Sequence, residues 1–510
     1  MKALQILTHA FFFSVILFWG CSKNPQENTV VQSLGIDRTN IPLPPGASVD
    51  SANITSSTSW TLSGASSWLT VTPSSGTGNT KVYFSATANT TTNSRTSSLV
   101  LNTSPAGANP VMVTVLQEQP NVVINFFTSH APGDSLITIN GSGFSGLISE
   151  NIVKINGALA TVVTASTTML TVRVPAKAGS GFIEVKVNTK SATSAIEFIY
   201  DWIGVVTVVA GGTAGNADGV GTSAQFWHPA GIEFDASDNL FVADYANNRV
   251  RRMTASLVVT TLPGRIPAVP GGPNTDFGLP QDVVADASGN VYVVEFNSSV
   301  ISKITPAGIV SVFAGDPTTH GYQDGTGTGA RFYQPAGIDI DASGNLIVAD
   351  TKNHRIRKIT PGAIVTTIAG SVQSYADGTG PNAYFNTPSG INVDQAGNYL
   401  VTDYYNNRIR KVTPAGVVTS YAGNGSHGSA DGTLLTANIY QPIAITSDNN
   451  GNIYLSDGNG KLRWISPSGR VSTIIPTITF SSIQGLAIDS NGVLFFADYF
   501  NNRICKITIK

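Results

Sequence analysis

Seven of the aromatic residues in the C-terminal part of the chain, each within two residues of an Asn, Asp or Gln, are candidates for a ligand site. An aromatic ring gives the C–H face of a sugar a flat apolar surface, while amide and carboxylate groups pair with the sugar hydroxyls. This combination favours carbohydrate binding without a chemical reaction. The candidate ligand-binding residues are Trp227, Tyr245, Tyr333, Tyr404, Tyr405, Tyr440 and Tyr499.

A repeated frame sets the positions of these residues. The stretch PAGIDIDASGNLIVADTKNHRIRKIT at residues 335–360 recurs in six copies. The first Asp of the successive copies is Asp235, Asp286, Asp341, Asp394, Asp448 and Asp489. A repeat of this length in a β-rich, Gly-rich sequence predicts a propeller or a solenoid.

Each copy is predicted to form four short strands, which together make one propeller blade. In the third copy the strands are Gly337–Ile340, Asn345–Ala349, Arg355–Ile359 and Ile364–Ala369. Turn-forming residues separate these β-branched runs. Six blades close a ring. The sixth copy holds three strands, so we expect Val205–Ala210 to supply its fourth strand and leave no open sheet edge.

The motifs P-x-G-I, G-N-L-x-V-A-D and N-x-R-I-R-K-I-T resemble the NHL repeat family over Val205–Lys510. The resemblance implies a six-bladed β-propeller. The second copy has Glu295 in place of Asp and Ser299-Val300 in place of Asn-Arg, and the fifth copy is one residue shorter at Gly458–Lys461. We expect these two blades to lack the polar contacts inside the repeat.

The candidate residues belong to two kinds of segment at one end of the blades. The long connections before a blade and the turns between its second and third strands lie at the same end, because both follow an even-numbered strand. Three connections share the pattern D-G-x-G-x-x-A-x-F. We expect its Phe226, Phe332 and Phe385 to pack inside the blades, which leaves the neighbouring aromatic residues for a ligand.

Four acidic residues at the ends of second strands precede an Arg by five positions. Because the pair recurs as part of the repeat, we expect a structural contact that ties the turn together, not a binding ring. The pairs are Asp244/Arg249, Asp350/Arg355, Asp403/Arg408 and Asp498/Arg503.

Two other functions stay open. A protein-binding or adhesion scaffold would present the same aromatic face to a protein. A lyase or hydrolase would need a metal ion in the propeller channel, but the histidines stand at different places in their repeats, as scattered surface residues would. These are His228, His320, His354 and His427. No nucleophile elbow, HExxH or P-loop motif is present, so we expect no catalytic residue, no metal and no cofactor.

The first 21 residues form a predicted targeting signal. Lys2 precedes an apolar run, Ile6–Trp19, that is too short to span a bilayer comfortably. The Gly-Cys-Ser that ends it resembles a bacterial lipoprotein signal, with Phe18 where Leu is preferred, and implies lipidation of Cys21. Residues 22–35 read as a polar tether. We expect a cell-envelope protein, an outer-membrane lipoprotein exposed to the exterior.

Two β-domains are predicted before the repeats. Residues 36–119, with W-L-T-V-T-P-S-S-G-T-G-N, resemble the BACON domain of Bacteroidetes surface proteins, and Trp60 and Trp68 are expected in its core, not as sugar platforms. Residues 120–201, with I-T-I-N-G-S-G-F, resemble the IPT/TIG fold. The BACON resemblance implies carbohydrate binding or a spacer role, of which we expect the spacer, and the IPT/TIG resemblance implies a rigid spacer. The expected fold is all-β, with two β-sandwich (immunoglobulin-like) domains followed by a six-bladed NHL-type β-propeller.

Composition limits the partners. Charged residues make up 12% and the net charge is −2, so no broad attraction to nucleic acid is expected. Two cysteines, one of them in the signal, give no disulfide framework, and Cys505 is expected to be a small buried apolar residue. The expected partners are a polysaccharide or a surface protein, together with the membrane through the lipid at Cys21. The chain is expected to be a monomer.

Overall fold

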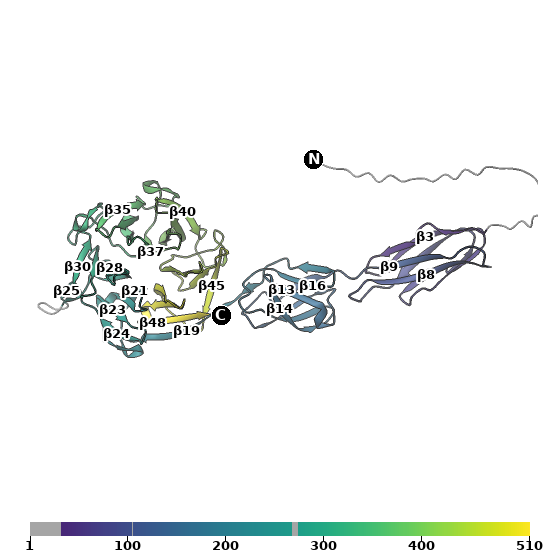
Figure 1. Cartoon of the computed structure of the whole chain (residues 1–510), viewed down its shortest axis with the longest axis horizontal. Helices are drawn as coiled ribbons and strands as arrows, with labels where there is room; N and C mark the ends of the chain where they lie inside the picture. Colours follow the sequence, from purple (N-terminus) through teal and green to yellow (C-terminus); the bar gives the residue numbers. More distant parts are fainter. Residues whose placement is uncertain (1–31, 105, 268–273) are drawn as a thin grey trace, which may run out of the picture.

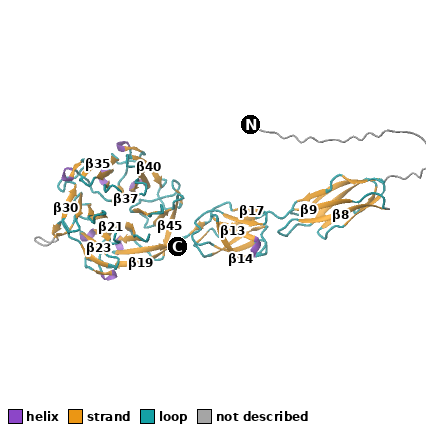
Figure 2. Ribbon diagram, in the orientation of Figure 1, coloured by secondary structure: helices purple, strands orange, loops and turns teal. Residues whose placement is uncertain are grey.

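The computed structural model describes residues 32–104, 106–267 and 274–510. Figure 1 shows two elongated β-domains and a ring in a row. Strands make up most of the structure, and the helices among the described residues are short 3-10 turns (Figure 2). The all-β architecture that the sequence predicts is confirmed. The predicted signal, with Cys21, lies outside the described residues.

The N-terminal domain is a sandwich of two sheets around one core. One sheet has the order β1 (Leu34–Ile36), β3 (Ser48–Ser56), β7 (Thr80–Ala86), β5 (Leu69–Thr72). The other has the order β2 (Asn40–Leu43), β9 (Val111–Gln117), β8 (Arg95–Ser104), β4 (Ser59–Ser63), β6 (Ser75–Thr77). Trp60 is fully buried and donates its Nε1–H to the Gly78 carbonyl at 3.1 Å. Trp68 packs at the core edge under the Arg95 guanidinium, so the expected core role is confirmed for Trp60.

The second domain wraps one run of strands around a core that includes Phe144. The order is β10 (Val123–Phe127), β12 (Leu136–Ser142), β15 (Met169–Arg173), β14 (Ala158–Ala165), β13 (Asn151–Ile155), β16 (Ile183–Val187), β17 (Lys190–Thr193). A small pair, β11 (His130–Ala131) and β18 (Ile199–Tyr200), lies beside the exit of the chain. Gly143 has a φ of +74°, and a Cβ there would meet the Asn121 carbonyl oxygen, so the turn before Phe144 requires glycine.

The ring consists, in the described residues, of six four-stranded blades, each with its first strand innermost. Blades 1 to 3 are β21 (Pro229–Phe234) to β24 (Val258–Thr261), β27 (Pro280–Ala285) to β30 (Val310–Ala314), and β32 (Ile338–Ile340) to β35 (Ile364–Ala369). Blades 4 and 5 are β37 (Pro388–Val393) to β40 (Val417–Ala422) and β42 (Ile445–Ser447) to β45 (Arg470–Pro476). Blade 6 is β46 (Ile483–Ile488), β47 (Leu494–Asp498), β48 (Arg503–Ile509) and β19 (Trp202–Gly211).

Ring closure uses the strand that the sequence predicts. Strand β19 pairs antiparallel with β48, with Val206 opposite Ile507, and so completes blade 6. It begins three residues before the predicted start, and Trp202–Gly204 also pair parallel with β45 of blade 5. The N-terminal end of the ring is therefore held by two blades, which leaves no free edge at the closure.

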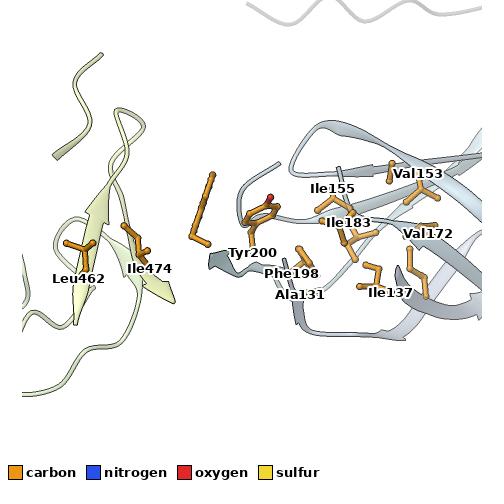
Figure 3. Close-up of a cluster of buried hydrophobic side chains, with 14 of the residues drawn as sticks. Ala131, Ile137, Val153, Ile155, Val172, Ile183, Phe198, Tyr200, Leu462 and Ile474 are labelled. Atoms are coloured by element: carbon orange, nitrogen blue, oxygen red, sulfur yellow. The ribbon is translucent and has the colours of Figure 1, made fainter. Parts of the chain in front are cut away.

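The second domain and the propeller share an apolar junction. Tyr200 and Trp202 lie with ring centroids 4.6 Å apart, and Trp202 meets Trp464 of blade 5 edge-to-face at 4.3 Å. Figure 3 shows Leu462 and Ile474 of the propeller on one side of Tyr200 and the second-domain core on the other. An Arg470–Glu197 ion pair of 2.8 Å flanks the junction.

The two N-terminal domains are joined by polar contacts. Thr92 donates to Glu150 at 3.0 Å, and Asn188 donates to the Thr92 carbonyl at 2.8 Å. Gln119, at the domain boundary, donates to the Val187 carbonyl. Contacts at both junctions favour a fixed spacer between the N-terminus and the propeller.

Candidate functional site

A buried Arg holds each long connection against its blade. In blade 3, Arg357 pairs with Asp350 at 2.6 Å and with Asp324 of the connection at 2.8 Å, and Arg357 and Asp350 are both fully buried. Arg357 also donates to the carbonyls of Gln323 and Arg331. The same arrangement recurs in blades 1 and 4, as Arg251 with Asp244 and Asp218, and Arg410 with Asp403 and Asp377.

The expected pairing of Asp with the Arg five positions later is wrong in these three blades. In blade 3 the two arginines lie on one face of β34 (Arg355–Ile359). Arg355 stacks over the Tyr322 ring at 3.6 Å, whereas Arg357, two residues further along the strand, pairs with the Asp350 carboxylate. The prediction holds only in blade 6, where Arg503 pairs with Asp498 at 2.8 Å.

The two blades that depart from the frame keep their polar contacts, so that expectation is also wrong. In blade 2, Arg265 from the preceding connection makes a two-point hydrogen bond to the buried Glu295, and Ser302 donates to the same carboxylate. Although burial raises the pKa of Glu295, these hydrogen bonds hold it below its usual value. In blade 5, Arg463 pairs with Asp431 at 3.0 Å and Asp457 at 3.3 Å.

In blade 6 a cysteine takes the position of the buried arginine. Cys505 stands seven residues after Asp498, where blades 1, 3 and 4 have Arg, and it is fully buried. Burial raises the pKa of its thiol to about 12. The predicted role as a small buried apolar residue is confirmed.

Hydrogen bonds between neighbouring blades fix the ends of the connections before blades 1 to 5. The residue before the Pro of the frame donates its N–H to a side chain of the preceding blade's turn, and both residues have positive φ. The bonds are His228 to Asn502, Leu279 to Asn248, Gln334 to Ser299, Thr387 to His354, and Gln441 to Asn407, at 2.9–3.3 Å. His354 is therefore a half-buried structural residue, not the surface histidine expected, and burial lowers its pKa.

Three of the seven candidates meet at the junction of blades 6 and 1. We call Trp227, His228, Tyr245, Tyr499 and Phe500 the 6/1 aromatic cluster. His228 stacks on Tyr499 at 4.5 Å, with Trp227 6.2 Å from His228 and Tyr245 6.1 Å from Tyr499. Trp227 and Phe500 are 47% and 60% exposed. Burial of the half-buried rings raises the pKa of Tyr245 and Tyr499.

The other candidates lie at two more blade junctions. Tyr404 and Tyr405 contact each other edge-to-face at 4.8 Å, and Tyr404 donates to Gln441 at 3.1 Å. Tyr440 of the same junction lies 5.2 Å from His427, and Tyr333 stands apart, 5.7 Å from His320. Among these, Tyr405 and Tyr333 are exposed. The candidates therefore form separate groups around the rim and do not line one pocket.

The Phe residues of the connections pack as predicted. Phe226, Phe332 and Phe385 are fully buried. Each ring lies about 5 Å from the guanidinium of the buried Arg of its blade, at 5.3, 5.0 and 5.2 Å. The buried Arg and Phe thus hold the base of the loops that carry the exposed rings.

The central channel carries three carboxyl groups that sequence reasoning missed. Its narrow part, about 50 Å³, is lined by the first strands of all six blades and includes Glu233, Asp282 and Asp339. Asp282 accepts the Ile338 N–H at 3.0 Å, across the junction to blade 3. Asp282 stands where four other copies of the frame have Gly (Gly231, Gly337, Gly390 and Gly485). This departure from the repeat is the sequence feature that could have indicated a carboxyl group in the channel. No group of three or more potential metal ligands comes together in the described part of the chain.

Burial in the channel raises the pKa of Asp282 to about 7 and that of Asp339 to about 6. The pKa of Glu233 is raised as well, first by burial and then by the charges of Asp339 and Asp282. A wider opening of about 380 Å³ lies where Glu233 and Asp339 meet the turns after the first strands. These turns follow an odd-numbered strand, so this opening is at the end opposite the aromatic groups.

Stability is expected to fall as pH rises from about 4 to 7. In this range the folded protein holds protons on the channel carboxyls that the unfolded chain has released, so the free energy of unfolding decreases with pH. Substituting Asp282→Asn removes the charge and keeps one of the two oxygens that accept the N–H groups of Ile338, at 3.0 Å, and Val283, at 2.9 Å. It should raise stability at pH 8 by roughly 2 kcal/mol and flatten the profile. Urea denaturation of wild type and variant at pH 5 and pH 8 checks this, and an equal loss in both proteins would contradict it.

Comparison with protein families matches each of the three regions. The IPT/TIG domain model matches residues 122–200, and the NHL repeat model matches 332–359 and 385–412, in blades 3 and 4. The BACON model, described as a candidate N-terminal binding domain, matches 58–118. The chain contains BACON, IPT/TIG and NHL-repeat domains. The family resemblances read from the sequence motifs are thereby confirmed.

The curated relatives match about half of the chain. The chain is 26% identical over 310 residues to Protein SUPPRESSOR OF QUENCHING 1, chloroplastic, of Arabidopsis thaliana, covering 55% of this chain and 29% of that protein. It is 27% identical over 297 residues to NHL repeat-containing protein 2 of Bos taurus, covering 49% of this chain and 40% of that protein. The chain therefore spans less than half the length of these relatives.

Among solved structures, an auxiliary nutrient binding protein from Bacteroides thetaiotaomicron aligns with a TM-score of 0.47 and 16% identity, over 76% of this chain and 98% of that one. In the described residues, the BACON, IPT/TIG and NHL-repeat protein has no helix long and apolar enough to cross a membrane.

Proposed function

We propose that this protein captures a polysaccharide, without catalysis, on the face of the propeller that carries the aromatic groups. The 6/1 aromatic cluster carries the proposal. Its five rings come from one long connection and two turns, and two of them, Trp227 and Phe500, expose about half or more of their surface. Exposed rings that are fixed by buried neighbours suit the stacking of sugar faces.

Polar groups beside the rings supply partners for hydroxyls. Asn247 and Asn502 lie in the turns that hold Tyr245 and Tyr499, and Asn502 Oδ1 accepts the His228 N–H. This bond fixes the backbone that carries the His228 ring, so the ring loses little conformational freedom when a ligand binds. The second group, Tyr404 and Tyr405, gives a further contact for a chain longer than one sugar.

We infer that the protein acts at the cell surface, attached through a lipid on Cys21. The apolar run that ends at Cys21 supports this location. The two N-terminal domains are joined to each other by hydrogen bonds, and the second contacts the propeller through Tyr200 and Trp202, so together they would hold the aromatic face away from the membrane.

The Trp227→Ala variant should lower affinity for the recognised polysaccharide at least tenfold, about 1.4 kcal/mol, because it removes the exposed indole of the 6/1 aromatic cluster. The measurement is retention of the chain from residue 22 to 510 on xylan, mannan, pectin and starch, followed by titration calorimetry with the retained glycan. Tyr83→Ala is the matched control, since Tyr83 is an exposed aromatic residue of the BACON domain (45% exposed).

Equal losses in both variants, or no retention on any glycan, would overturn the proposal. In the second case, capture of a surface protein that Trp227→Ala abolishes would support the adhesion-scaffold alternative. The function would then stay on the same face with a different partner.

A further inference from the structure

A separate hollow lies between the IPT/TIG domain and blade 5, away from the aromatic face. Its volume is about 240 Å³. The IPT/TIG loop around Lys177–Ser180 forms one wall, and strands β44 (Leu462–Ile465) and β45 of the propeller form the other. Ligand sites occur preferentially at such domain boundaries.

The charged residues among those that line the hollow are both basic. Lys177 is exposed and has no ion-pair partner within the described residues. Arg470 donates from Nη1 to Glu197, a residue that does not line the hollow. The Nε of Arg470 has no hydrogen-bond partner among the described residues. With two cations and one nearby carboxylate, the hollow keeps one positive charge uncompensated and is suited to a single anion.

Hydroxyl groups and aromatic rings complete the lining. Ser472 is 4% exposed, lines the hollow and makes no side-chain hydrogen bond in the structure as described. Ser180 accepts the Tyr200 N–H, and its own hydrogen has no acceptor among the described residues. Trp202 and Trp464 form the apolar side.

The backbone holds this arrangement in place. Lys177 has a φ of +58°, and its N–H donates to the Tyr200 hydroxyl at 2.8 Å. Asn156 donates to the Ala178 carbonyl at 2.8 Å and fixes the same loop. The loop is thus anchored to Tyr200, which also packs against Trp202 at the domain junction.

We propose that this hollow binds a sugar that carries a carboxylate, such as a uronic acid residue of an acidic polysaccharide. The carboxylate would meet Lys177 and Arg470, the sugar hydroxyls would pair with Ser472 and Ser180, and a C–H face would lie on the indole side. The site is independent of the 6/1 aromatic cluster, and its ligand class does not rest on the proposed function.

The test is calorimetric titration of the chain 22–510 with D-galacturonate, D-galactose and acetate. Galacturonate should bind at least tenfold more tightly than the neutral galactose and more tightly than acetate. The Lys177→Gln variant should weaken galacturonate binding five- to tenfold. Lys186→Gln, an exposed lysine on β16 of the same domain that does not line the hollow, should leave it unchanged.

The proposal is overturned if galactose binds as tightly as galacturonate, if Lys177→Gln keeps full affinity, or if no galacturonate binding occurs up to about 50 mM, a concentration beyond the weakest useful affinities. Acetate binding equal to that of galacturonate would show an anion pocket without sugar recognition and would also overturn it. Trp227→Ala should bind galacturonate normally, which separates this site from the aromatic face.

Discussion

The Asp350→Ala variant is expected to lower the free energy of unfolding of the propeller by about 3–5 kcal/mol. The substitution leaves the guanidinium of Arg357 fully buried beside Asp324 alone, and removal of one member of a buried ion pair leaves a charge without compensation. Asp350 also accepts the Tyr333 N–H at 2.9 Å, so the connection before blade 3 loses a second contact. The shift in the urea midpoint, followed by circular dichroism, measures the effect.

Arg355→Ala is the matched control for this prediction. Arg355 lies two residues from Arg357 on the same strand, is half-buried and stacks on Tyr322 without pairing with Asp350. Its loss should cost less than about 1 kcal/mol, as for other partly exposed charged contacts. Similar midpoints for the two variants would show that the buried pair does not stabilise the blade.

The Gly485→Val variant is expected to destabilise the ring by about 3 kcal/mol or more. A Cβ at Gly485 would meet the Ala230 carbonyl oxygen and lie 2.8 Å from the Ile232 nitrogen, both in the innermost strand of blade 1. These backbone atoms cannot rotate away as a side chain would, so blades 6 and 1 would have to separate. Thermal unfolding together with limited proteolysis at this junction measures the loss.

Gly329→Val serves as the control for added side-chain volume. No atom lies within 4 Å of a Cβ built at Gly329, in the short turn Gly327–Gly329. This variant should unfold near the wild-type temperature. If Gly485→Val behaves the same way, the close approach of the innermost strands does not limit ring closure.

Most of the fold could be predicted because its signals are local and repeated. In blade 3, the strands Arg355–Ile359 and Ile364–Ala369 have the predicted bounds, since β-branched runs and turn residues specify them without distant partners. The closing strand could also be predicted. The sixth copy lacked a fourth strand, and the β-rich run Val205–Ala210 belonged to no copy.

The internal contacts of the blades could be predicted only in part. The repeated Asp and Arg residues indicate an ion pair, but Arg355 and Arg357 lie on one face of the same strand, so local pattern does not choose between them. The choice depends on the connection that folds over Arg357 and brings Asp324 to it. In blade 2 the buried Glu295 is paired instead with Arg265, which lies in a segment without a repeat motif.

The sequence by itself determined the three domain types, the six blades, the strand that closes them and the end of the propeller where the aromatic residues lie. The tertiary structure alone decided which rings meet, which carboxyls share the channel, and that Lys177, Arg470 and Ser472 line one hollow. The physical reason is distance along the chain. Strand patterns depend on neighbours a few residues away, whereas a site depends on burial and charge contributed by segments tens to hundreds of residues apart.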